Sequence, residues 1–188
     1  MTLKKPSPMM LQWEECKKKS DSALLLFRLG DFYEAFHEDA AILAKDLGLT
    51  LTKRQGTPMA GIPFHASEQY IDKLISKGHR IAVAEQMEDP KEVKGIVKRD
   101  VVRIITAGSL IDSFLLVENT NNFISSLTLL NQAFGFSILD VTTAECKVFE
   151  FDTFSSFRDE LIRLQPKELI LSEKCFAKHK EEIGRAHV

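Results

Sequence analysis

An aromatic ring and a carboxylate stand two positions apart at Phe32 and Glu34, directly after the apolar run Leu24–Leu29. The run is typical of a buried strand, and Gly30 marks the turn that follows it. An exposed aromatic on such a rigid support can insert between base steps from the minor groove and unstack them. The pattern therefore indicates a candidate contact with a nucleic acid.

A helix start is the competing interpretation of the same residues. Asp31 would be the N-cap and Glu34 the third helical residue, in a close variant of the capping box. Phe32 would then pack in the core, because it opens a series of apolar residues at helical spacing that ends before Gly48: Phe32, Phe36, Ala40, Leu43 and Leu47. Local sequence favours this helix, although Asp31 can cap it while Phe32 points outward.

The rest of the chain offers weaker candidates. Two basic pairs, Lys53-Arg54 and Lys98-Arg99, can contact phosphates or stay hydrated. None of the five histidines has metal-ligand spacing, and neither a GxxxxGK[ST] phosphate loop nor a GxSxG nucleophile turn occurs. The three cysteines are widely separated and are expected to be reduced thiols. We therefore expect no catalytic residue, cofactor or metal site in this chain.

The composition is that of an ordinary globular protein, with 44% hydrophobic and 28% charged residues among 188. Residues 1–108 hold 17 basic and 15 acidic side chains, whereas residues 109–188 hold 8 and 12. The first part is thus better suited to meet a polyanion. No apolar run reaches the length of a membrane span, and no signal-peptide core follows Met1–Pro6, so we expect a cytoplasmic protein without a membrane partner.

The remaining patterns predict two α/β units that join near Thr106–Ser113. In the first unit, Ser7 and Pro8 open a helix, and the prolines of Pro58–Pro63 indicate a turn or an edge strand. Further strands are expected at Leu49–Lys53, Arg80–Glu85 and Val101–Thr106, and a surface loop at Lys91–Asp100. A helix is expected that is capped by Ser67 and ends before Gly78. In the second unit, the three strands of a meander are expected at Phe123–Leu130, Phe134–Val141 and Cys146–Phe151. A helix at Phe157–Leu164 and a strand at Glu168–Leu171 are expected to follow.

Six segments, in this order, resemble the start of the MutS family of DNA mismatch repair proteins. They cover nearly all of residues 8–106: Pro8–Met10, Phe27–Glu34, Leu51–Arg54, Pro58–His65, Ala82–Gln86 and Val101–Thr106. The resemblance implies an α/β fold, with a mixed-sheet mismatch-recognition domain and its flanking helices in residues 1–107. It further implies a linker at 108–116 and a truncated connector domain, which is RNase H-like, at 117–181.

The same resemblance assigns roles to individual residues. It implies that the chain binds double-stranded DNA with mismatches or small loops. Phe32 would stack on the mispaired base from the minor groove, and Glu34 would hydrogen-bond that base. Lys53, Arg54 and Met59 are expected to contact the DNA backbone or groove.

The resemblance also implies features of longer family members: an ATPase domain using ATP and magnesium, a homodimer, a MutL-type partner protein and a place at the bacterial nucleoid. We expect this chain to be a monomeric fragment without ATPase activity, and therefore no enzyme. Residues 182–188 can be encoded by a nucleotide string that resembles a common sequencing-library adapter, which predicts a non-native tail.

Two alternatives stay open at this point. One is a small metal-dependent nuclease, with Asp31, Glu34 and Asp140 as metal-binding carboxylates. The other is a protein-interaction module, in which the meander docks a partner protein and Phe32 is buried.

Overall fold

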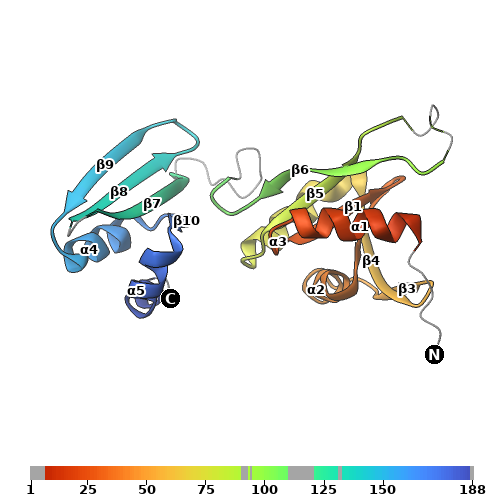
Figure 1. Ribbon diagram of the computed structural model, residues 1–188, viewed down its shortest axis with the longest axis horizontal. Coiled ribbons are helices and arrows are strands. Elements are labelled where there is room, and N and C mark those ends of the chain that lie inside the picture. Colours follow the sequence, from red (N-terminus) through yellow and green to blue (C-terminus); the bar gives the residue numbers. More distant parts are fainter. Residues whose placement is uncertain (1–6, 90–92, 94, 110–120, 131–132, 187–188) are drawn as a thin grey trace. The chain divides into compact units, whose positions relative to one another are not determined.

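The structure, a computed structural model, describes residues 7–89, 93, 95–109, 121–130 and 133–186. They form two compact units, Met1–Thr106 and Ala107–Val188, and each unit has its own mixed sheet and helices (Figure 1). The predicted α/β class is confirmed. Most of the linker predicted at 108–116 lies outside the described residues. No helix in the described part of the chain is both long enough and apolar enough to cross a bilayer.

The first unit contains a six-stranded sheet in the order β3-β4-β2-β1-β5-β6. Only the pair β1 and β5 is parallel, and every other neighbouring pair is antiparallel. The mixed sheet implied by the resemblance is therefore present. Its strands are β1 (Leu24–Leu29), β2 (Phe32–Phe36), β3 (Thr52–Arg54), β4 (Thr57–Pro63), β5 (Ile81–Gln86) and β6 (Arg99–Ile105).

Residues 32–36 form strand β2, so the helix predicted to begin after Asp31 is wrong in its first part. A two-residue turn with Gly30 in a left-handed conformation (φ 60°) brings Phe32 opposite Leu29. Strand β2 then pairs with β1 on one side and β4 on the other, and this pairing outweighs the local helical spacing. Helix α2 (His37–Leu47) begins five residues later than the residue predicted to open it, and Asp31 caps no helix.

The Pro58–Pro63 segment is also more regular than expected. It belongs to β4, which lies between β3 and β2 and is therefore neither a turn nor an edge strand. The edge position falls to the short strand β3. Strand β4 is thus placed to bring residues of the Pro58–Pro63 segment beside β2.

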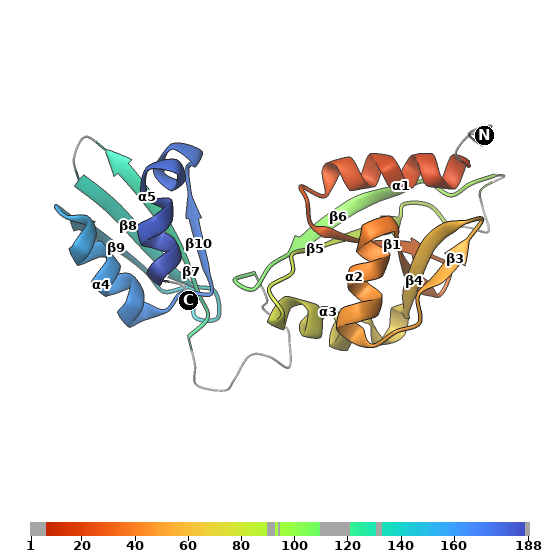
Figure 2. The ribbon, with the colours of Figure 1, turned by 90° about the horizontal axis from the view of Figure 1, so that it is seen from below.

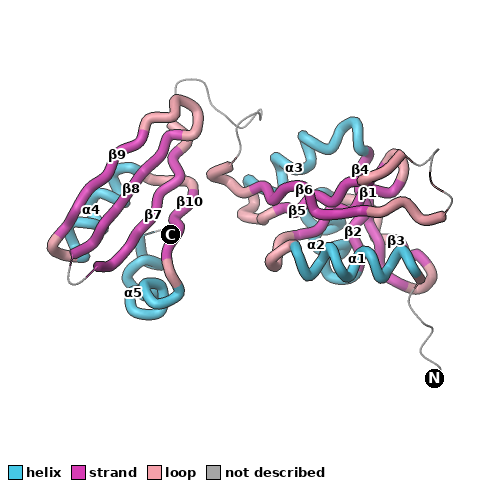
Figure 3. Tube along the Cα trace, turned by 45° about the horizontal axis from the view of Figure 1, so that its top comes forward, coloured by secondary structure: helices cyan, strands magenta, loops and turns pink. Residues whose placement is uncertain are grey.

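Helices α1 (Pro8–Lys19) and α3 (Ser67–Ser76) lie on opposite sides of this sheet, as Figures 2 and 3 both show. The predicted start of α1 is confirmed, because the Ser7 side chain accepts a hydrogen bond from Met10 N at 3.3 Å. Trp13 and Cys16 of α1 pack in a buried cluster with Leu25, Phe27, Phe36, Ala82 and Ala84 of the sheet. Helix α1 therefore covers the side of the sheet to which Phe27 and Phe36 point.

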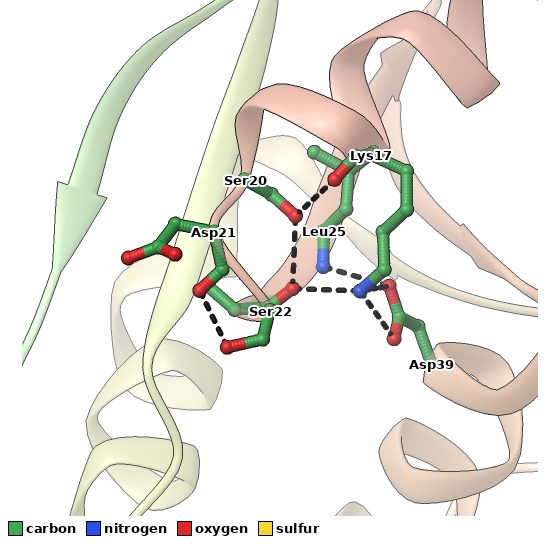
Figure 4. A network of polar contacts seen from close by, with 7 residues as sticks. Lys17, Ser20, Asp21, Ser22, Leu25 and Asp39 are labelled. Atoms are coloured by element: carbon green, nitrogen blue, oxygen red, sulfur yellow. Dashed lines mark hydrogen bonds and ion pairs between the residues drawn. The ribbon is translucent and has the colours of Figure 1, made fainter.

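A network of polar contacts joins α1, β1 and α2 (Figure 4). The Lys17 ammonium lies 2.8 Å and 2.9 Å from the two carboxylate oxygens of Asp39 and donates to the Ala23 carbonyl at 2.8 Å. Asp39 also accepts a hydrogen bond from Leu25 N at 2.9 Å, and its side chain is buried. The network fixes the start of α2, directly after β2, against the start of β1.

The second unit contains a four-stranded sheet in the order β10-β7-β8-β9. The predicted antiparallel meander is confirmed as β7 (Phe123–Leu130), β8 (Ala133–Asp140) and β9 (Cys146–Phe151), and β10 (Glu168–Leu171) pairs with β7 in parallel. Helices α4 (Phe154–Leu164) and α5 (Glu173–Ala186) supply Phe157, Leu161 and Ile183 to its core. A non-native origin of residues 182–188 stays a prediction, and residues 187 and 188 lie outside the described part.

Candidate nucleic-acid interface

Phe32 opens strand β2 at the end of the β1–β2 hairpin, where it pairs with Leu29 and Pro63. Alternate residues of a strand share a face, and directly paired residues of neighbouring strands share it too. Phe32, Glu34, Phe36, Gly61 and Arg54 therefore lie on one side of the sheet, which we name the Phe32 face. Phe36 is fully buried, whereas 48% of Phe32 is exposed.

Helix α1 explains this gradient along the Phe32 face. Trp13 contacts Phe36 edge-to-face with 6.0 Å between ring centroids, so the Phe36 end is covered. Phe32 lies four residues before Phe36, at the start of β2, and is not part of the cluster beneath α1. The predicted burial of Phe32 in the core is therefore wrong, and the interaction module that required it loses its support.

Glu34 lies between these two residues and forms an ion pair on the same face. Its Oε2 atom is 2.8 Å from Arg54 Nη1, and 14% of the Glu34 side chain is exposed against 46% of the Arg54 side chain. Gly61 stands directly opposite Glu34 on β4, and a Cβ atom there would lie 3.4 Å from Glu34 Cγ and 3.3 Å from Tyr33 O. Glycine thus leaves the Glu34 side chain its room.

The three accessory residues predicted from the sequence separate in the structure. Arg54 joins Glu34 on the Phe32 face. Lys53 precedes Arg54 in strand β3, so it belongs to the opposite face, where it is exposed. Met59 is partly buried and packs against the core cluster beneath α1, opposite Phe36. The structure therefore brings Phe32, Glu34 and Arg54 together, and it sets Lys53 apart from them.

Four residues on the opposite face hold the hairpin, and sequence reasoning gave none of them a role. The Arg28 guanidinium carbon lies 3.2 Å from the centroid of the Phe64 ring and 5.6 Å from that of the Tyr33 ring. The buried Tyr33 hydroxyl donates a hydrogen bond to the Glu85 carboxylate on β5. Burial, together with this hydrogen bond, raises the pKa of Tyr33 to about 12.

A main-chain contact ties the tip of the hairpin to the end of β4. Phe64 N donates to the Asp31 carbonyl at 2.8 Å. Phe64 directly follows Pro63, the partner of Phe32. This hydrogen bond therefore holds the turn against the end of β4. In the sequence, the only sign of such a contact was that Asp31 and Phe64 lie in two segments that carry the resemblance, Phe27–Glu34 and Pro58–His65.

The three carboxylates proposed as nuclease ligands belong to different units, with Asp31 and Glu34 in the first and Asp140 in the second. Asp31 is exposed on the turn, whereas Asp140 is buried in the second unit. Asp140 accepts hydrogen bonds from the Thr142 hydroxyl at 2.7 Å and from Thr142 N at 3.0 Å, and the hydroxyl bond in particular lowers the pKa of Asp140. Within the described ranges, no three acidic, histidine or cysteine side chains are placed to hold a metal ion.

Comparisons with known proteins match both units. The model of MutS domain I matches residues 7–113, and the model of MutS domain II matches residues 122–187. The DNA mismatch repair protein MutS of Protochlamydia amoebophila is 56% identical over 93% of this chain and 20% of its own length. Proteins of the same name from Chlamydia abortus and Thermosipho melanesiensis are 45% and 47% identical over 97% and 99% of this chain. The chain spans about a fifth of the length of these relatives.

Proposed function

The chain belongs to the MutS family, and from this premise we propose that its first unit binds duplex DNA at mispaired or unpaired bases. One observation carries the proposal: the half-exposed Phe32 ring at the open end of the Phe32 face, on a strand that is paired on both sides. The names of the relatives, DNA mismatch repair protein MutS, support it.

Phe32 is the residue proposed to stack on the mispaired base from the minor groove. Stacking tolerates any sequence because every base has a π-face, so a single ring can sense many mismatches. Inserting a ring between base steps costs a few kcal/mol of unstacking, and this cost is lower where the step is already weakened by a mispair. Selectivity then follows from the deformability of the DNA.

Glu34 is proposed to hydrogen-bond the same base, because it lies on the Phe32 face two residues further along β2. Arg54 and Lys53 are exposed cations on strand β3, which β4 separates from β2, and we propose that they contact phosphates. Met59 packs beneath α1 and is proposed to support the groove contact from the core side.

The proposed role of the first unit is binding, and we assign no catalytic step to either unit. The resemblance places the ATP-dependent signal, the homodimer and the MutL-type partner in the longer proteins of the family. For this chain those features stay predictions, because it spans about a fifth of its relatives.

Substituting Phe32→Ala tests the proposal. We compare the affinities of the unaltered chain and the variant for a duplex with one G·T mispair and for its matched counterpart, by fluorescence anisotropy at low ionic strength. Stacking on one base contributes about 1–3 kcal/mol, so the mismatched affinity should fall about tenfold or more, while the matched affinity changes little.

Val102→Ala is the matched control, because Val102 is 49% exposed on strand β6 of the same sheet. It should leave both affinities unchanged. An unaltered preference for the mispair in Phe32→Ala would remove Phe32 from the mechanism.

A further inference from the structure

We infer that Arg54 is the positioning residue of Glu34 and thereby helps to determine mismatch specificity, beyond any contact it makes with phosphates. The inference rests on the proposed function and deepens it. Its basis is the ion pair of 2.8 Å between Arg54 Nη1 and Glu34 Oε2 on the Phe32 face.

Glu34 is more deeply buried than Arg54, and this difference in burial suggests different roles for the two side chains. The Glu34 side chain is only 14% exposed, so most of its hydration is lost already in the free protein. A carboxylate in that position is stabilised by a charge-assisted hydrogen bond from a guanidinium. Arg54 is 46% exposed and can reach solvent or a phosphate while it keeps Glu34 oriented.

Charge makes the pair necessary when the face meets DNA. Phe32 and Glu34 share one strand, so a ring inserted into the minor groove carries the carboxylate toward two rows of phosphates. An isolated anion there is repelled by the phosphates, whereas the Arg54–Glu34 pair is neutral as a whole. Arg54 therefore lowers the electrostatic cost of bringing Glu34 to the base.

The local backbone leaves Glu34 room on the side where Arg54 stands. Gly61 is directly opposite Glu34, and its missing side chain leaves the carboxylate's stem room beside β4. Strand β3, which carries Arg54, lies on the far side of β4 from β2. The Glu34 side chain thus reaches across Gly61 to its partner, and the pair spans three strands.

A double-mutant cycle separates positioning from phosphate binding. We measure the affinities of the whole chain for the G·T and matched duplexes in the unaltered protein, Arg54→Ala, Glu34→Ala, the double variant and Arg54→Lys. Arg54→Ala should lower the ratio of mismatched to matched affinity about three- to fivefold, as expected for a partly exposed ion pair. In the Glu34→Ala background the same substitution should leave the ratio unchanged, and Arg54→Lys should restore it only in part.

Lys53→Ala is the matched control, because it removes the same charge from the same strand on the opposite face. It should lower both affinities by one common factor. If Arg54→Ala behaves in the same way, with additive effects in the cycle, Arg54 is a phosphate contact only and the inference is overturned. Phe32→Ala is measured in parallel, so that failure of the inference can be told apart from failure of the proposed function. If the preference for the mispair survives Phe32→Ala, or if the unaltered chain binds neither duplex, the proposed function is overturned and the inference with it.

Discussion

At the scale of single residues, the two faces of β2 carry side chains with different roles. Phe32 and Glu34 lie on the Phe32 face, and Tyr33 between them is buried on the other face. The types and spacing of these residues were enough to single out the candidate site. The resemblance implied an accessible Phe32, whereas the helical spacing of Phe32 and Phe36 implied a buried one. Spacing within the segment could not show that Trp13 covers Phe36 while 48% of Phe32 stays exposed.

Tyr33 should titrate late. Burial and the hydrogen bond to Glu85 raise its pKa from the ordinary 10.0 to about 12. The folded state therefore holds the phenolic proton more tightly than the unfolded state, so the stabilisation is complete below pH 10.0 and is lost as pH rises toward about 12. An ultraviolet titration of tyrosinate should contain a component near this pKa.

Tyr33→Phe should abolish that late component, and Tyr70→Phe, which alters the only other tyrosine, should keep it. The alkaline loss of stability between those pH values should shrink in Tyr33→Phe alone. A late component that persists in Tyr33→Phe would show that Tyr33 is not the tyrosine with the raised pKa.

At the scale of elements, most of the framework could be predicted and the central hairpin could not. Helix α1 has a local capping signal in Ser7 and Pro8, and the meander has short turns between apolar strands. Strand β2 depends on non-local partners instead, since β4 comes from residues 57–63. Spacing within one segment does not report such pairing. The apolar spacing of residues 32–47 therefore predicts a helix that begins at Phe32, five residues before the observed start of α2.

The elements around β2 are held by the ion pair between the partly buried Lys17 and the buried Asp39 (Figure 4). Asp39→Ala leaves the Lys17 ammonium and Leu25 N without their carboxylate partner, so we expect a loss of about 3 kcal/mol in the free energy of unfolding. Urea denaturation measures it.

Glu38→Ala is the control for this substitution, because Glu38 is exposed in the same first turn of α2. Its effect should stay within about 0.5 kcal/mol. Equal effects of the two substitutions would contradict the role given to the network, and reduce Asp39 to a general contribution at the helix N-terminus.

At the scale of the whole molecule, the chain is two units with different characters. The first holds the candidate interface and the small excess of basic side chains, and the second holds the acidic excess and a separate aromatic core. Their matches to MutS domain I and MutS domain II give the family. Neither the charge difference nor the strand patterns could have named it, whereas the six ordered segments of the first unit did.

Cross-linking tests the central claim most directly. A duplex with 5-iodouracil at the thymine of a G·T mispair is irradiated with the bound protein, and the attached peptide is mapped by mass spectrometry. A ring stacked on the mispaired base should give a cross-link at Phe32, and the same duplex without the mispair should give little. A cross-link confined to other residues, or one at Phe32 of equal yield in both duplexes, would contradict recognition of the mispair by Phe32.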